Sequence, residues 1–161
     1  WVIGRLSTVY GISPRMRFDL TVNDFALNAF KKKYLDIFLP KSYRPYIHVF
    51  DLAKVVLKII DNFPTVKNNV FNIGFMGENY QKIQIADAVC QYIDGVKIDI
   101  LKEGGDMRDY QVDFGKLKKY LNLKNVYNVD SGLKQIIEIL NSGLISDPDL
   151  SVYYNTKPDL L

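Results

Sequence analysis

The feature that most constrains this chain is the alternation of short apolar segments with longer segments whose apolar residues recur at helical spacing. Residues 21–33 show this spacing clearly, with Val22, Phe25, Ala26 and Ala29 on one side of a helix. Three further amphipathic helices are expected around residues 51–62, 85–93 and 130–141, and a short one around 114–121. Strands are expected at 1–6, 36–39, 46–50, 70–73 and 96–100. Strands that alternate with amphipathic helices indicate an α/β fold.

Polar side chains next to these helices suggest where each one begins. Thr21 is a candidate N-cap for the first helix and Asp51 for the second. Asp113 is a candidate for the short helix, and Asp130 or Ser131 for the last one.

Composition limits the classes of protein to consider. The 161 residues are 48% hydrophobic and 24% charged, which is typical of a globular protein and excludes extensive disorder. Apolar runs are far shorter than the roughly 20 residues of a membrane span. One cysteine and one histidine exclude an intrachain disulfide and a Cys/His zinc site. The net charge of +3 is too weak to indicate nucleic acid. We therefore expect no metal, nucleic-acid or membrane partner, and a cytoplasmic location.

The two ends of the chain differ in character. It opens with Trp1-Val2-Ile3, which has no polar lead-in and reads as a buried strand already in progress. We expect this chain to be part of a longer protein, with an exposed and sticky sheet edge if it exists alone. Residues 146–161 contain two proline breaks and are expected to form an irregular surface tail.

Several catalytic motifs are missing from these residues. The sequence has no Gly-x-Gly-x-x-Gly fingerprint, no P-loop and no Gly-x-Ser-x-Gly elbow. Tyr-x-x-x-Lys occurs at Tyr120 and Lys124 and again at Tyr153 and Lys157, which chance explains because both residue types are frequent. No catalytic residue is assigned in this chain.

Three polar spots remain as candidate ligand contacts. Residues 7–11 follow the first strand, and ligands of open α/β sheets bind beyond the carboxyl ends of strands. Asn23 lies in the first turn of a helix, where free N–H groups attract anions, although Asp19 and Asp24 nearby oppose an anion. Arg44 precedes a proline and has aromatic neighbours, which suits a phosphate-binding guanidinium better than a solubilising charge.

Three other side chains have a structural and a functional interpretation. His48 alternates with apolar residues, so a core histidine is the favoured interpretation. Asp51 is interpreted as a helix cap in preference to a catalytic acid. Arg108 fits a second phosphate ligand and an ion-paired surface residue equally well.

The order of these segments resembles the extended short-chain dehydrogenase/reductase family, which includes the NAD-dependent epimerases and dehydratases of nucleotide sugars. Residues 5–11 (Arg-Leu-Ser-Thr-Val-Tyr-Gly) resemble the end of its sixth Rossmann strand. Residues 44–51 (Arg-Pro-Tyr-Ile-His-Val-Phe-Asp) resemble its R-x-[FYW]-[IV]-H-V-x-D segment. Residues 70–74 (Val-Phe-Asn-Ile-Gly) and 106–117 resemble later motifs, and the resemblance runs to about residue 142.

This resemblance implies the C-terminal half of such an enzyme. Residues 1–145 would hold the last strands of a Rossmann-type parallel sheet, interleaved with a small mixed α/β substrate-binding domain. The glycine fingerprint and the catalytic tyrosine and lysine would then lie upstream. Thr8, Val9 and Tyr10 would line the nicotinamide of NAD or NADP, which is held mainly by residues outside this chain; many relatives carry Asn at the position of Thr8.

The expected partner is a nucleotide-diphosphate sugar. By the same resemblance, Asn23 and Arg44 would contact its diphosphate, and Arg108 would assist in some branches of the family. Family homodimers form through helices outside this chain, so the oligomeric state stays open. Epimerases, dehydratases and reductases of the family share this half, so the sequence does not distinguish among these reactions. It also does not identify the nucleotide base or the sugar of the substrate. One alternative is a non-catalytic module that binds a nucleotide sugar or a protein partner. Another is a basic nucleic-acid-binding domain, suggested only by the pI near 8.8 and the lysine run Lys31–Lys33.

Overall fold

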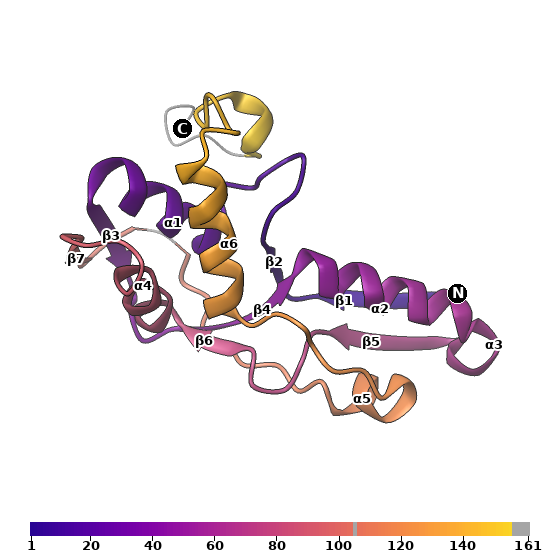
Figure 1. Cartoon of the computed structure of the whole chain (residues 1–161). Coiled ribbons are helices and arrows are strands. Elements are labelled where there is room, and N and C mark those ends of the chain that lie inside the picture. Colours follow the sequence, from indigo (N-terminus) through magenta and orange to yellow (C-terminus); the bar gives the residue numbers. More distant parts are fainter. Residues whose placement is uncertain (105, 156–161) are drawn as a thin grey trace.

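The computed structural model describes residues 1–104 and 106–155. It has an elongated arm that ends at the N-terminus and a broader lobe that carries the C-terminal segment (Figure 1). The elements follow in the order β1 (Val2–Leu6), β2 (Thr8–Tyr10), α1 (Thr21–Lys32), β3 (Tyr34–Phe38), β4 (Tyr43–His48), α2 (Val49–Asp61), α3 (Phe63–Val66), β5 (Asn69–Ile73), β6 (Asn79–Gln81), α4 (Lys82–Cys90), β7 (Lys97–Leu101), α5 (Gly115–Leu121), α6 (Val129–Asn141) and the 3-10 turn η1 (Ser151–Tyr153).

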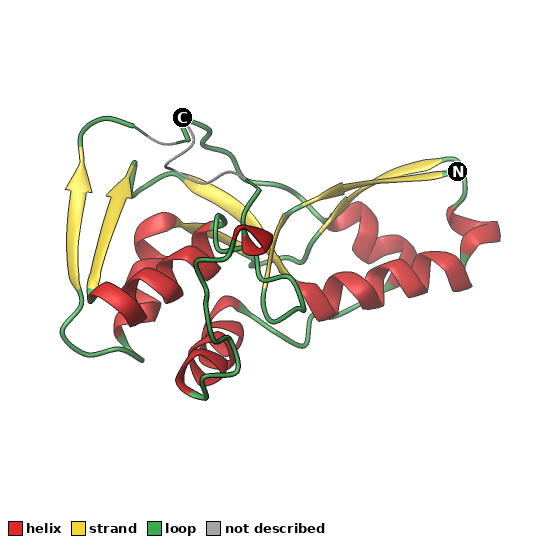
Figure 2. Cartoon of the chain, turned by 90° about the horizontal axis from the view of Figure 1, so that it is seen from above, coloured by secondary structure: helices red, strands yellow, loops and turns green. Residues whose placement is uncertain are grey.

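The strands form three small sheets in the described part of the chain. β1 runs parallel to β5 in the arm, and β3 runs parallel to β7 at the far end of the lobe (Figure 2). Between them, β2 pairs in parallel with β4, and β4 pairs antiparallel with β6. Ser7 alone separates β1 from β2, and its N–H and Oγ both donate to the carbonyl of Ile73. The first strand therefore leaves the arm at Ser7 and enters the central sheet.

Two apolar cores hold these elements together in the described part of the chain. The larger core lies where α1, α4 and α6 pack together, and it buries the predicted stripe of α1 together with that of α6. The smaller core lies under α2 in the arm and consists of Ile47, Val55, Val66, Phe71, Ile73, Phe75 and Leu117. The helical spacing in the sequence therefore identified the buried faces of α1 and α6 correctly. On α2 the prediction is only partly right, since Val55 is buried but Val56 and Ile60 are 46% and 62% exposed.

None of the residues predicted to cap the four helices occupies the N-cap position. Leu20 occupies the N-cap position of α1 without a side-chain bond, so Thr21 is already the first helical residue. His48 caps α2, because its Nδ1 accepts from the N–H of Phe50 at 3.3 Å. Asn128 caps α6 in a reciprocal pair with Ser131. Asp113 lies one residue before the cap position of α5 and accepts from the N–H of Gly115.

Strand β1 was expected to be buried, but it is largely exposed. Ile3 and Leu6 of β1 are 52% and 58% exposed, since β5 is the only strand that pairs with β1 among the described residues. The expected exposed edge is present. Residues 8–10, expected to belong to a loop, form strand β2, and strand β6 is absent from the sequence-based prediction.

The C-terminal tail is more ordered than expected over the residues that the structure describes. Ser151–Tyr153 forms a 3-10 turn, and the rings of Tyr153 and Tyr154 pack on the fully buried ring of Phe18. Residues 156–161, and with them Lys157 of the second Tyr-x-x-x-Lys pair, lie outside the described residues.

Candidate functional site

A cavity of about 350 Å³ lies where the first strand passes from the arm into the central sheet. Five of the six residues predicted to bind cofactor or substrate line it: Thr8, Val9, Tyr10, Asn23 and Arg108. The other lining residues are Leu6, Ser7, Gly11, Ser13, Arg15, Arg17, Leu20, Val49 and Tyr110. The fold thus gathers residues from positions 6–23 and 108–110 around one space, as the sequence motifs suggested.

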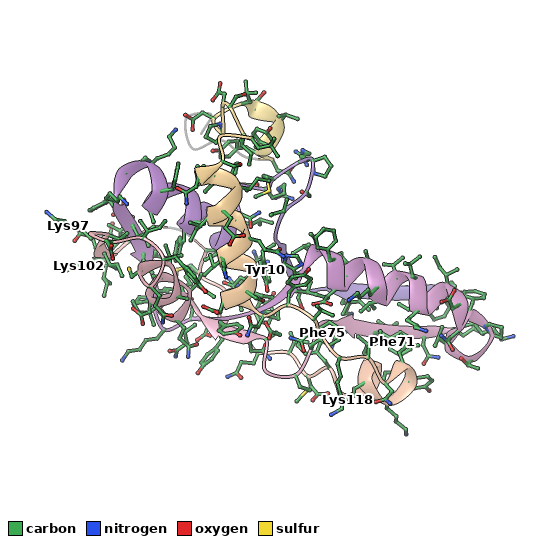
Figure 3. The ribbon with its side chains drawn as sticks, in the orientation of Figure 1. Tyr10, Phe71, Phe75, Lys97, Lys102 and Lys118 are labelled. Carbon is green, nitrogen blue, oxygen red and sulfur yellow. The ribbon has the colours of Figure 1, made fainter. Side chains whose placement is uncertain are left out.

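Strand β2 supplies the floor of this cavity. Thr8 and Val9 are half-buried, while the Tyr10 side chain is 2% exposed and packs edge-on against Tyr46 and His48. Burial raises the pKa of Tyr10 far above its ordinary value, with smaller contributions from nearby acidic groups, Glu78 first among them. Tyr10 is labelled at the junction of arm and lobe in Figure 3. Its phenol is therefore a neutral, structural part of the wall.

Asn23 is buried in the first turn of α1 and ties that helix to the end of β2. Its Oδ1 accepts a hydrogen bond from the N–H of Gly11 at 3.1 Å. Gly11 has φ +109°, and a Cβ there would lie 2.4 Å from Nε2 of His48, so only glycine fits. This bond uses the oxygen of the Asn23 amide and so fixes which side of the amide carries the NH2 donors.

The two carboxylates that oppose an anion near Asn23 are both engaged elsewhere. Asp19 accepts two hydrogen bonds from Arg17, at 2.7 and 2.8 Å. Asp24 accepts from Asn28 at 2.7 Å, and burial raises the pKa of Asp24 to about 6. The charge that these groups direct at the cavity is therefore reduced.

Arg44 does not line the cavity but lies directly beside its wall. Its side chain is 6% exposed, and its guanidinium lies 5.0 Å from the ring centre of Tyr110, which does line the cavity. Nη2 lies 2.8 Å from Oδ2 of Asp106, yet neither Nη atom forms an aligned hydrogen bond among the described residues. A buried guanidinium whose donors are not all satisfied is energetically costly, and Asp106 is the carboxylate that offsets this cost here.

Arg108 is an ion-paired surface residue that also reaches the cavity. Its side chain is 72% exposed, and Nε and Nη2 both donate to the carboxylate of Asp106. The hydrogen bonds from Arg108 and the charge of Arg44 hold the pKa of Asp106 well below its usual range. One carboxylate thus bridges the two arginines that the motifs singled out.

His48 and Asp51 are structural in this fold. His48 is 1% exposed and stacks on Tyr127 with ring centres 4.2 Å apart, which confirms the interpretation as a core histidine. Asp51 does not cap α2; its buried carboxylate accepts from the N–H groups of Val126 and Tyr127. These bonds fasten the segment before α6 to α2.

Three residues at the site went unnoticed in the sequence. Arg15 and Arg17 line the cavity from the loop between β2 and α1, and Asp106 pairs with Arg44 across 62 residues of sequence. The cluster Ser-Pro-Arg-Met-Arg at 13–17 contains two cations and was the available signal for the first two. Nothing local marks Asp106 as the partner of Arg44.

Some kinds of site are absent from residues 1–104 and 106–155. No group of three or more His, Cys, Asp or Glu side chains there could hold a metal ion. Within the same residues, no helix has the length and apolar character needed to cross a membrane.

Comparison with known proteins addresses the resemblance directly. The model of the NAD dependent epimerase/dehydratase family matches residues 1–74, which include three of the four motifs. Residues 1–74 are therefore similar to the NAD-dependent epimerase/dehydratase family. The fourth motif, at 106–117, lies outside the matched stretch.

Solved epimerase and dehydratase structures share the fold. UDP-glucuronic acid 4-epimerase from Bacillus cereus matches 88% of this chain with a TM-score of 0.75 and 22% identity. ADP-L-glycero-D-manno-heptose-6-epimerase from Helicobacter pylori matches 88% with a TM-score of 0.72 and 20% identity. dTDP-glucose 4,6-dehydratase from Bacillus anthracis matches 89% with a TM-score of 0.69 and 18% identity. The mixed α/β architecture with parallel, Rossmann-type sheets is confirmed.

This chain covers only 44–45% of the length of those three structures. Activity, substrate and cofactor of a whole epimerase or dehydratase are therefore matters for proposal.

Proposed function

We propose that this chain is the substrate-binding half of an NAD(P)-dependent epimerase or dehydratase and that its cavity holds a nucleotide-diphosphate sugar. The observation that carries the proposal is the buried guanidinium of Arg44, which has no aligned hydrogen bond among the described residues and lies beside the cavity wall. A diphosphate supplies charged acceptors in the fork geometry that a guanidinium prefers.

The diphosphate is bound by three side chains, those of Asn23, Arg44 and Arg108. The Asn23 amide is oriented by the N–H of Gly11, so its NH2 group donates to a phosphate oxygen. Arg44 and Arg108 exchange their shared partner Asp106 for phosphate oxygens. Because these contacts lie away from the reacting sugar carbon, their binding energy serves to orient the sugar.

The chain can hold only a small part of a nicotinamide cofactor. The half-buried Thr8 and Val9 and the buried Tyr10 offer a mostly apolar wall that suits the flat face of a nicotinamide. The sequence has no glycine fingerprint for a pyrophosphate. Bound NAD or NADP would supply a hydride acceptor and donor for the sugar. Tyr10, buried and neutral, contributes shape and not proton transfer.

Isothermal titration calorimetry tests the proposal with UDP, ADP, dTDP and GDP, each alone and as its sugar conjugate. We expect at least one of the diphosphates to bind, and Arg44→Ala to weaken that binding by about 10- to 100-fold. The control is Lys118→Ala, which removes one exposed cation on α5, away from this cavity (Figure 3). Absence of binding for all four diphosphates and their sugars would overturn the proposal.

A further inference from the structure

The loop between β2 and α1 is held in place by the C-terminal segment, which is far away in the sequence but in direct contact with the loop. The N–H of Phe18 donates to the carbonyl of Tyr153 at 3.0 Å, and the N–H of Asn155 donates to Asp19 at 3.1 Å. The Phe18 ring is fully buried, 5.7 Å from the ring centre of Tyr153. Figure 1 shows the two segments side by side at the top of the lobe.

Arg15 joins the same contact by three hydrogen bonds. Its Nε donates to the carbonyl of Val152 at 2.7 Å, and its Nη2 donates to the carbonyl of Tyr154 and to Oδ1 of Asn155. These bonds span 137 to 140 residues of sequence. Three acceptors in one fork fix the plane of a guanidinium that would otherwise rotate freely in solvent.

Arg15 differs from the other arginines on the cavity wall in the kind of group that accepts its hydrogen bonds. Arg17 is paired with Asp19, and Arg108 with Asp106. The acceptors of Arg15 are main-chain carbonyls and an amide oxygen, and none of the ion pairs within residues 1–104 and 106–155 includes it. Within the part of the chain that the structure describes, Arg15 therefore presents to the cavity a positive charge that no carboxylate pairs with.

We infer that residues 152–155 act as a clamp that holds Arg15 at the cavity as a further contact for the diphosphate of the nucleotide sugar. The inference rests on the proposed function and adds a residue and a chain segment to it. Leu20, Arg17 and Ser13 line the same wall, so the clamp also sets the shape of the space available to the ligand. In this arrangement Arg15 binds the ligand, and Tyr153 is a positioning residue.

The test compares UDP with uridine, which lacks the diphosphate, in calorimetric titrations of the protein and its variants. Arg15→Ala is expected to weaken UDP binding by about 5- to 20-fold and to leave uridine unchanged. Lys118→Ala is the charge-matched control. Unchanged UDP affinity in Arg15→Ala, together with loss in Arg44→Ala, would overturn this inference and leave the proposed function standing. If the parent protein binds none of UDP, ADP, dTDP and GDP, both this inference and the proposed function are wrong.

The clamp is tested separately through Tyr153. Tyr153→Ala is expected to weaken UDP binding to the same extent as Arg15→Ala, and the double variant to be no weaker than either alone. Tyr153→Phe keeps the ring against Phe18 and should bind UDP like the parent. Additive losses would contradict the inference, because they would mean that Tyr153 acts independently of Arg15.

Hydrogen exchange provides a readout that needs no ligand. In Tyr153→Ala the amide of Phe18 should exchange at least tenfold faster, while amides of α4 keep their rates. Unchanged exchange at Phe18 would show that residues 152–155 do not clamp the loop.

Discussion

Nη2 of Arg44 lies 2.8 Å from Oδ2 of Asp106, an ion pair between a buried cation and a carboxylate that is 40% exposed. The same carboxylate also receives Arg108. Because Asp106 is reachable from solvent whereas Arg44 is not, an entering anion can replace the carboxylate without moving the guanidinium out of the core. Asp106 thus offsets one of the two positive charges of Arg44 and Arg108, and the pair of arginines keeps a net positive charge.

Removal of Asp106 should therefore destabilise the protein in a way that an anion repairs. Asp106→Ala leaves Arg44 buried without its carboxylate, and we expect a loss of about 2 kcal/mol in the free energy of unfolding. Saturating pyrophosphate should raise the melting temperature of this variant more than that of the parent. Scanning fluorimetry of both proteins and of the exposed-site control Asp94→Ala checks this. Equal pyrophosphate shifts in all three would contradict the exchange of partners.

Glu78 predicts a pH dependence of stability. It is 6% exposed, and its burial, with a smaller contribution from Asp51, raises its pKa to about 7. A carboxyl whose pKa is higher in the folded state favours folding below its unfolded pKa near 4.5 and loses that contribution as the pH rises through 7. Glu78→Gln should then be more stable than the parent at pH 8, by up to about 3 kcal/mol, and no more stable at pH 4.

Urea unfolding at the two pH values measures this difference. The charge-matched control is Glu138→Gln on the exposed side of α6, which should show no such pH-dependent gain. A Glu78→Gln gain that is the same at pH 4 and pH 8 would exclude the ionisation of Glu78 as its cause.

Gly132 marks the closest approach of α6 to the floor of the cavity. A Cβ at this position would lie 2.4 Å from the ring of Tyr10 and 3.1 Å from His48, both buried. Gly132→Ala should cost about 1–3 kcal/mol despite the better helix propensity of alanine. Lys134→Ala, two residues on and exposed, should leave stability within about 0.5 kcal/mol of the parent. A stabilised Gly132→Ala variant would contradict this packing.

The exposed face of β1 predicts self-association. Trp1, Ile3 and Leu6 are all more than half exposed, and the strand pairs only with β5 among the described residues. Unpaired strand edges with apolar side chains recruit other chains. Ile3→Lys should therefore lower the aggregated fraction of this polypeptide in dynamic light scattering, whereas Lys97→Ala at the distant β7 should not. Equal aggregation of the parent and Ile3→Lys would rule out this edge as the cause.

The sequence predicted the helices better than their ends. The stripes of α1 and α6 were recognisable because helical spacing is local, and both are buried. The stripe of α2 was equally recognisable, but Val56 and Ile60 are exposed because no described element covers them. The N-cap positions at Leu20, His48 and Asn128 were missed because Thr21 and Asp51 are better capping residues than Leu20 and His48, and Ser131 is as good as Asn128. Where each helix begins is decided by the tertiary fold. Strands β2 and β6 are three residues long and exist through their pairing with β4, which no local pattern reports.

The candidate site was predictable where motifs mark it. Thr8, Asn23 and Arg108 come together at one cavity, as their positions in the motifs implied, while Arg44 lies one side chain away. The ligand-binding roles of these residues stay predictions. The contacts of Arg15 with residues 152–155 had no local signal, since they join the two ends of the chain through main-chain carbonyls.

The central claim is that Arg44 holds a diphosphate, and the most direct test is the affinity of the protein for UDP relative to uridine, with and without this guanidinium. We expect UDP to bind at least about tenfold tighter than uridine, and Arg44→Ala to abolish most of that difference while uridine binds as before. Arg44→Lys should restore only part of it, because an ammonium cannot form the two-pronged contact. If Arg44→Ala retains the full preference for UDP, the diphosphate is held elsewhere and the account of this site is wrong.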